Sequence, residues 1–440
     1  MLKNTRGTVF RRNVSWQFVG SATQAVLSGL VLLVMGRGLG AAGFGEYSII
    51  IGFVTVANLM MEPRMQDVGA RVFWSLASDP EAQPAHREAF IDFVVLESMA
   101  KLLPLAGIAL LAIPLAAMAH LQSDGALLIA VAAFGNYLAK VGYGVSSGVL
   151  RVLGRSDQFT YCGSGELFAR LLILLTLAGL GQLTVASSVV VLSVTLIFSN
   201  VVQMSLAMRH IGNIGHALAT WSPRTLLSRL RPHRRLVLSN IGLSAADLMN
   251  KDLDITLLSP VMPAATIGVY KMAKNIALLT WRAVDPFYLA LMPELNRRVL
   301  TGNYAGARSL IRRSIVGLSA LAITLSAAAY LGVWLLGERL FGVAFAGIPH
   351  LLSWMLIGIV GSAPLVWGHP LAVAMNRGDT AFFGSLVGSA IGFTAFLVLV
   401  GLYGIEGAAI SWALSFLPTF LFTSIVARQL LLRRIAESKR

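Results

Sequence analysis

The chain has 440 residues, of which 56% are hydrophobic and only 12% are charged, and its mean hydropathy is +0.74. Soluble domains carry about a quarter charged residues, so this composition excludes a soluble globular protein and predicts a polytopic membrane protein. The net charge of +15 would suggest a nucleic-acid partner in a soluble protein, but here the basic residues are concentrated in the loops between apolar segments. The single cysteine, Cys162, excludes an internal disulfide.

Apolar segments of about 20 residues predict helices that cross the bilayer, and therefore an all-α fold. We predict twelve of them, at residues 14–36, 44–63, 90–118, 125–150, 159–181, 184–208, 236–258, 265–291, 311–336, 347–372, 380–402 and 404–427. The loops alternate between arginine-rich and nearly uncharged ones, and both termini belong to the arginine-rich set. Because positive loops stay inside, we expect both termini in the cytoplasm.

The second half of the chain repeats the first at an offset of 223 residues. The offset aligns Ala41-Ala42 with Ala264-Ala265, Gly45-x-Tyr47 with Gly268-x-Tyr270, and Glu62-Pro63 with Asp285-Pro286. Two six-helix halves of equal topology form a parallel repeat, which places a substrate site between the halves. The predicted organisation is an N-lobe at 1–208, a basic cytoplasmic linker at 209–235, a C-lobe at 236–427 and a basic tail at 428–440.

The segments 236–258 and 265–291 carry charges at a density that is rare in membrane spans. In the first, helical spacing puts one polar stripe on one face: Asn240, Ser244, Asp247, Lys251 and Asp254. Asp252 falls off that stripe, and Gln24 lies in the corresponding stripe of the segment 14–36. Two interpretations stay open, because these charges could line a cavity or could neutralise one another at spacings of three and four.

Basic residues are the second feature of these spans. The segment 265–291 carries Lys271, Lys274 and Arg282, and Lys271 and Lys274 have few partners on their own helix, so we favour a functional role for both. Lys140, in the segment 125–150, has no opposite charge three or four residues away and is the candidate cation of the first half. Two pairs of opposite charge lie four residues apart within spans, Glu97 with Lys101 and Glu166 with Arg170. We predict that the partners of each pair neutralise one another within the membrane.

Two acidic residues precede prolines near the predicted cytoplasmic ends of spans. Glu62-Pro63 and Asp285-Pro286 are candidate hinges, because proline frees a backbone carbonyl and kinks a helix. Helix termination with a solvated carboxylate is the alternative. His369 could sense protons near neutral pH, or it could be a hydrogen-bonded structural residue.

Several short motifs resemble those of a transporter family. The opening Arg11-Arg-Asn-x-x-Trp16, the segment Leu39-Gly-Ala-Ala-Gly-Phe-Gly-Glu-Tyr-Ser48, and Lys251-Asp-x-Asp254 followed by Ile267-Gly-Val-Tyr-Lys-Met-Ala273 look like polysaccharide flippases of the Wzx type. These O-antigen and exopolysaccharide transporters belong to the superfamily that also holds multidrug and toxin extrusion proteins and lipid II flippases. The resemblance covers the whole chain in helix count, repeat and loop sizes.

The resemblance implies a V-shaped transporter whose central cavity is lined by helices 1, 2, 7 and 8 and alternates between inward-open and outward-open states. It also implies a bacterial inner-membrane transporter with a substrate built on undecaprenyl pyrophosphate, for surface polysaccharide synthesis. Two alternatives stay open, a transporter that acts alone and one that acts alongside a polysaccharide polymerase and export machinery. Cations such as Lys271, Lys274 and Arg282 suit the phosphates of such a lipid-linked oligosaccharide. Coupling to H⁺ or Na⁺, or to consumption of the product outside, would drive the transport.

Other functions fit the sequence less well. A multidrug exporter of the same superfamily should present carboxylates to organic cations, whereas the segment 265–291 is rich in cations. A glycan polymerase or ligase usually carries a large outer loop with arginines, and the outer loops here are short. A non-transporting scaffold would not need charges inside its spans. No catalytic motif and no cluster with metal-ligand spacing occurs in the sequence, so neither an enzyme nor a metal or cofactor is predicted.

Overall fold

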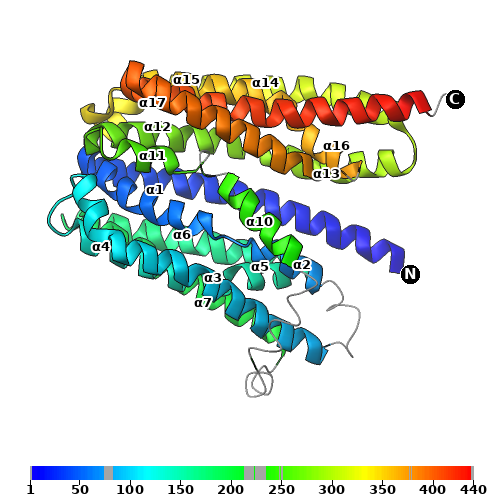
Figure 1. Cartoon of the computed structure of the whole chain (residues 1–440), viewed down its shortest axis with the longest axis horizontal. Coiled ribbons are helices and arrows are strands. Elements are labelled where there is room, and N and C mark those ends of the chain that lie inside the picture. Colours follow the sequence, from blue (N-terminus) through cyan, green and yellow to red (C-terminus); the bar gives the residue numbers. More distant parts are fainter. Residues whose placement is uncertain are drawn as a thin grey trace. The chain divides into compact units, whose positions relative to one another are not determined.

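The computed structural model describes residues 2–73, 83–212, 222, 234–246, 248, 251–375, 377 and 379–437 (Figure 1). The regular elements of these residues are all helices, which confirms the predicted all-α fold. They are α1 (Leu2–Met60), α2 (Met65–Val72), α3 (Gln83–Met118), α4 (Gly125–Lys140), α5 (Tyr143–Val152), α6 (Ser156–Gly179), α7 (Val185–Ile211), α10 (Arg234–Ala246), α11 (Leu253–Leu258), α12 (Ala264–Arg282), α13 (Asp285–Leu300), α14 (Tyr304–Phe341), η4 (Val343–Phe345), α15 (Ile348–Ser362), η5 (Ala363–Leu365), α16 (Gly368–Ala374) and α17 (Asp379–Glu437).

Eight helical stretches in the described part of the chain are long and apolar enough to cross a membrane. Two of them, in α1 and α17, are 42 and 56 residues long, about twice the length that one crossing needs. Each is kinked at a glycine with a left-handed backbone: Gly40 has a φ of 66° and Gly404 a φ of 58°. The predicted boundaries at 36–44 and 402–404 therefore coincide with kinks that separate two helical segments within α1 and within α17.

Four other predicted spans are interrupted where the sequence predicts one helix. The segment 125–150 divides into α4 and α5 at Gly142, and 347–372 divides into α15, η5 and α16. The segment 265–291 breaks between α12 and α13, directly before Asp285. The segment 236–258 ends as α10 at Ala246 and resumes as α11 at Leu253. Gly125–Val152 and Val343–Ala374 each still form one candidate span. Hydropathy predicts such a span but does not detect a local break in its backbone.

The structure divides the chain into two compact units. Unit 1 comprises Met1–Gly38 and Ile49–Ala245, and unit 2 comprises Leu39–Ser48 and Ala246–Arg440. The ten residues Leu39–Ser48 thus pack with the second half of the chain although both of their flanks belong to unit 1. Most of the predicted linker 209–235 lies outside the described residues.

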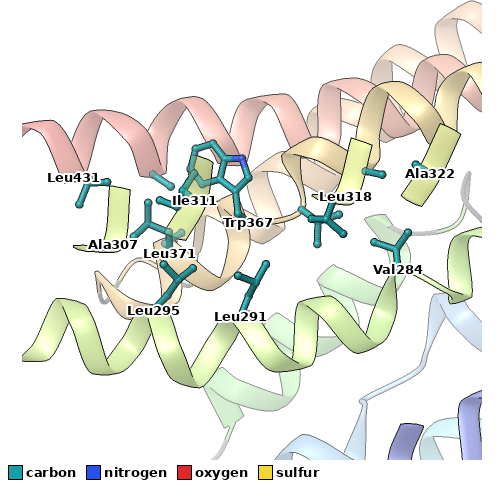
Figure 2. Packing of buried hydrophobic residues seen from close by; sticks show 14 residues of the cluster. Val284, Leu291, Leu295, Ala307, Ile311, Leu318, Ala322, Trp367, Leu371 and Leu431 are labelled. Atoms are coloured by element: carbon teal, nitrogen blue, oxygen red, sulfur yellow. The ribbon is translucent and has the colours of Figure 1, made fainter. Parts of the chain in front are cut away.

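Each unit has its own buried apolar cluster. In unit 1, side chains of α2, α3, α5 and α7 pack around Val68, Phe90 and Val149. In unit 2, Figure 2 shows Leu291 and Leu295 of α13 with Trp367 and residues of α14 and α17. Many other large apolar side chains are exposed. A bilayer is as apolar as leucine, so exposed apolar side chains are the expected surface of spanning helices, and close packing with polar contacts stabilises such bundles.

Candidate functional site

The charged residues of α11 and α12 form one cluster inside unit 2. Pro263 caps α12, and the turn at residues 259–263 reverses the chain so that the start of α11 lies beside the second turn of α12. Lys271 and Lys274 are three residues apart, so they point to the same side of α12. Their partners come from the other helix, a pairing that spacing along one helix does not reveal.

Lys274 is held by a saturated set of hydrogen bonds. Its Nζ atom lies 2.8 Å and 2.7 Å from the two carboxylate oxygens of Asp254, and it also donates to the carbonyl of Lys251. Asp254 accepts further hydrogen bonds from the Tyr270 hydroxyl and from its own neighbour, the backbone N–H of Ile255. The side chain of Lys274 is 0% exposed and that of Asp254 is 2% exposed. In this conformation the ammonium group of Lys274 has no donor left for a substrate.

Lys271 is arranged differently. Its Nζ atom lies 2.5 Å from a carboxylate oxygen of Asp252, and the two side chains are 16% and 15% exposed. The same Asp252 oxygen lies 3.9 Å from the Nζ atom of Lys274, so Asp252 connects the two lysines. The cluster therefore has a buried half, Lys274 with Asp254, and a partly exposed half, Lys271 with Asp252.

Asp252 is the residue that helical spacing missed. On a continuous helix it would point away from Asp254, because neighbours two apart are about 200° apart around the axis. The helix is broken there: Asp252 is the residue before α11 and has a φ of −123° and a ψ of 17°. This break turns both carboxylates towards α12. A signal was present in the sequence, since two lysines on one helix face require two nearby anions to be neutral in a membrane.

Among the remaining candidates of the second half whose side chains are described, none places its side chain in this cluster. The side chain of Lys251 is exposed, and Arg282 is the exposed last residue of α12. Asp247 lies outside the described residues, and nothing about the side chains of Asp285 and Pro286 is described beyond their place at the start of α13. His369 is the half-buried second residue of α16.

In unit 1 the polar stripe of α10 contacts the break after α1. The side-chain amide of Asn240 donates to the carbonyl of Pro63 at 3.3 Å, and the Ser244 hydroxyl accepts from Arg64 at 2.9 Å. Helix α1 ends at Met60, just before Glu62-Pro63, so helix termination is observed there. Two members of the predicted cavity stripe thus have a structural role in this conformation.

Both predicted intramembrane pairs of unit 1 are confirmed. Lys101 lies 3.0 Å from Glu97, and it also reaches Glu62 at 3.4 Å. Glu97 accepts from the backbone N–H groups of Gly144 and Val145, at the start of α5. The carboxylate of Glu62 is therefore not simply solvated, as termination alone would leave it.

The second confirmed pair is Glu166 with Arg170, and Thr195 of α7 joins it by donating to Glu166 at 2.9 Å. The two first-half candidates lie elsewhere. The ammonium of Lys140 lies 4.6 Å from the ring centre of Tyr143, and Gln24 lies against Gly163 of α6.

No family model matches the chain, and no curated protein matches its sequence. Solved structures do match its fold. A multidrug resistance MATE family transporter of the MOP superfamily, in its inward-facing conformation, matches with a TM-score of 0.71 at 14% identity, covering 92% of this chain and 96% of that one. Lipid II flippase MurJ, in its inward closed conformation, matches with a TM-score of 0.70 at 11% identity, covering 96% and 89%.

The MATE multidrug transporter DinF-BH in complex with R6G matches with a TM-score of 0.64 at 14% identity, covering 96% of this chain and 95% of that one. Identities this low carry information about the fold and not about the substrate. The MATE and MurJ matches have nearly equal scores, so they do not separate a drug exporter from a lipid flippase. The chain has the multi-pass helical fold that MATE and MurJ transporters of the MOP superfamily share.

Proposed function

We propose that this chain is a flippase that moves an undecaprenyl-pyrophosphate-linked oligosaccharide across a bacterial inner membrane by alternating access, for surface polysaccharide synthesis. The observation that carries the proposal is the division of the α11–α12 cluster into a saturated ion pair, Lys274 with Asp254, and a partly exposed one, Lys271 with Asp252. Both termini would lie in the cytoplasm. The cycle would be driven by a gradient of H⁺ or Na⁺, or by a polymerase that consumes the product outside.

The partly exposed pair is suited to exchange. Lys271 has a single carboxylate partner, whereas an ammonium group can donate three hydrogen bonds, so two donors are left for a second anion. A pyrophosphate offers more charge and more acceptor oxygens than one carboxylate, and in a site of low dielectric constant that difference is strengthened. The buried pair beside it would hold α11 against α12 while Lys271 changes partners.

The same geometry admits a second candidate, a multidrug exporter. In that case the incoming ligand is an organic cation, and it would replace Lys271 at the carboxylate of Asp252. The two functions therefore make opposite demands on one ion pair. The flippase needs Lys271 and can do without the charge of Asp252, and the exporter needs Asp252 and can do without the charge of Lys271.

The test compares Lys271→Ala, Lys271→Arg and Asp252→Asn in a strain whose surface polysaccharide depends on this chain. Membrane abundance, surface polysaccharide and trapped lipid-linked oligosaccharide are measured together. A flippase predicts normal abundance with lost export for Lys271→Ala, partial export for Lys271→Arg, and retained export for Asp252→Asn. Full export by Lys271→Ala would contradict recognition of phosphate at this residue.

A charge-swapped variant, Asp252→Lys with Lys271→Asp, serves as the matched control. It keeps one ion pair between the same two positions but moves the cation from α12 to the residue before α11. If the pair only stabilises the fold, the swapped protein should export. If Lys271 binds the substrate, the swapped protein should be abundant and inactive. Uptake and efflux of a cationic dye by Asp252→Asn and Lys271→Ala then tests the multidrug alternative.

A further inference from the structure

A stripe of aromatic side chains joins α17 to the C-terminal half of α12 inside unit 2. Trp412, Phe416 and Phe420 follow one another at intervals of four, so they share one face of α17. Trp412 and Phe416 lie 4.5 Å apart between ring centres, and Phe416 and Phe420 lie 6.4 Å apart. Trp281 of α12 completes this aromatic stripe, at 5.4 Å from Phe416 and 5.1 Å from Phe420.

Burial decreases along the aromatic stripe. Trp412 is 1% exposed and Phe416 is 7% exposed, as ordinary core residues are. Phe420 and Trp281 are only partly buried, so part of each ring is open at this end of the stripe. The buried end packs α17 against its neighbours, and the open end leaves an aromatic surface that a ligand can cover.

The open end of the stripe borders the polar face of α12. At about 100° per residue, Lys271 and Arg282 lie about 20° apart around the helix axis, and Trp281 lies about 80° from Lys271. Arg282 is exposed, and Lys271 is partly exposed. Charged side chains in membrane spans face an interior cavity and not the lipid. Trp281 therefore lies at the edge of the face that carries the proposed phosphate ligand.

A tryptophan followed by an arginine suits the binding of a sugar. The face of an indole ring is the negative part of its quadrupole. The C–H bonds on the apolar face of a pyranose carry partial positive charge, because each ring carbon is bonded to oxygen. The two surfaces attract one another, and stacking them also removes apolar area from water. Arg282 has five N–H donors for the hydroxyl oxygens at the edge of the same sugar.

The surface is held in place and lies at a suitable distance from the ion pair. Phe416 and Phe420 meet the indole of Trp281 at interplanar angles of 78° and 44°, so two neighbours fix the plane of the ring. A side chain that is already fixed loses little entropy when a ligand covers it. Trp281 follows Lys271 by ten residues, which is about 15 Å along the helix axis. A trisaccharide attached to a pyrophosphate at Lys271 spans this distance.

We propose that Trp281 and Arg282 form a sugar-binding surface, which stacks against a pyranose of the oligosaccharide while Lys271 binds the pyrophosphate. Phe416 and Phe420 are positioning residues that hold the plane of the indole. The inference rests on the proposed function, and it names the part of the substrate that the ion pair does not recognise. That part is a pyranose with an apolar face, two or three sugars away from the pyrophosphate.

The test measures the binding of two probes to the full chain in detergent. One probe is farnesyl pyrophosphate, and the other is farnesyl pyrophosphate that carries a trisaccharide of β-linked glucose, a sugar whose equatorial substituents leave C–H bonds on both faces. The parent should bind the trisaccharide probe more tightly than the bare probe. Trp281→Leu should weaken binding of the trisaccharide probe by about tenfold and leave binding of the bare probe unchanged. Trp281→Phe keeps a smaller ring against α17 and should lose less.

Trp354→Leu is the matched control, because Trp354 is a 37% exposed tryptophan on α15 of the same unit, and it should bind both probes like the parent. Equal losses for the two probes in Trp281→Leu would show that Trp281 only packs α12 against α17, and full binding of the trisaccharide probe would also overturn the proposal. If Trp281→Leu does not fold, the ratio of the two affinities in Trp281→Phe decides, and a ratio equal to that of the parent overturns the proposal.

Lys271→Ala separates the sugar-binding surface from the proposed function. We expect this variant to lose binding of both probes, because both carry the pyrophosphate. Normal binding of the bare probe by Lys271→Ala, with a trisaccharide probe that still depends on Trp281, would refute phosphate recognition and leave the sugar-binding surface in place. Loss of both probes in Lys271→Ala, with no effect of Trp281→Leu, would refute the sugar-binding surface alone.

Discussion

The contrast between the two ion pairs of unit 2 makes a quantitative prediction about stability. Lys274→Met removes the cation that lies 2.7 Å from Asp254 and leaves a carboxylate that is 2% exposed without its counter-charge. At an effective dielectric constant of about 20, the attraction lost at that distance is about 6 kcal/mol. Part of it is offset because the lysine no longer has to be desolvated, and removing one partner of a buried pair usually costs about 3–5 kcal/mol.

In Lys274→Met, Asp254 keeps its hydrogen bonds from Tyr270 and Ile255. These bonds favour the lower end of the range of about 3–5 kcal/mol, so we expect the free energy of unfolding to fall by about 3 kcal/mol. The variant Lys271→Met, in the partly exposed pair, should lose only about 1 kcal/mol. Chemical unfolding of the purified protein in detergent measures both. Similar losses in the two variants would refute the division of the cluster into a buried and an accessible half.

A double-mutant cycle isolates the pair itself. Asp254→Asn combined with Lys274→Met removes both charges, and it should recover about 2 kcal/mol of the loss seen with Lys274→Met alone. Additive losses would show that Lys274 stabilises the fold through the packing of its stem and not through Asp254.

Three further predictions concern polar groups outside this cluster. Glu97→Gln should lower the free energy of unfolding by about 3 kcal/mol, because Glu97 is buried and binds a lysine and two backbone N–H groups. Glu62→Gln removes only a 3.4 Å contact with Lys101, so it should lower the free energy of unfolding by less than about 1 kcal/mol. Equal losses in unfolding measurements would contradict this order. Thr195→Val should lower the free energy of unfolding by about 1–2 kcal/mol, because Glu166 loses a buried hydrogen-bond donor. The Thr280 hydroxyl donates only to a carbonyl of its own helix, so the matched variant Thr280→Val should leave the free energy of unfolding nearly unchanged. Two arginines that donate hydrogen bonds to Glu294 lower its pKa to about 2. The contribution of Glu294 to the free energy of unfolding should therefore be constant above about pH 5 and should vanish as the pH falls through about 2. A difference in stability between Glu294→Gln and the parent that changes between pH 6 and 8 would refute this prediction.

The sequence by itself determined the class of the protein and most of its local structure. Long apolar segments form helices whatever their neighbours are, because every backbone N–H and C=O in lipid must be paired within the segment. Pairs at a spacing of four, such as Glu97 with Lys101, are also local, since one helix positions both partners. The repeat at an offset of 223 residues is also present in the sequence itself, where it aligns Gly45-x-Tyr47 with Gly268-x-Tyr270.

Only the tertiary structure decided which charge meets which. The break before α11 rotates Asp252 out of the position that helical spacing assigns to it, and it thereby gives Lys271 a partner. Such a break depends on how α11 packs against α12, and neither hydropathy nor periodicity records packing.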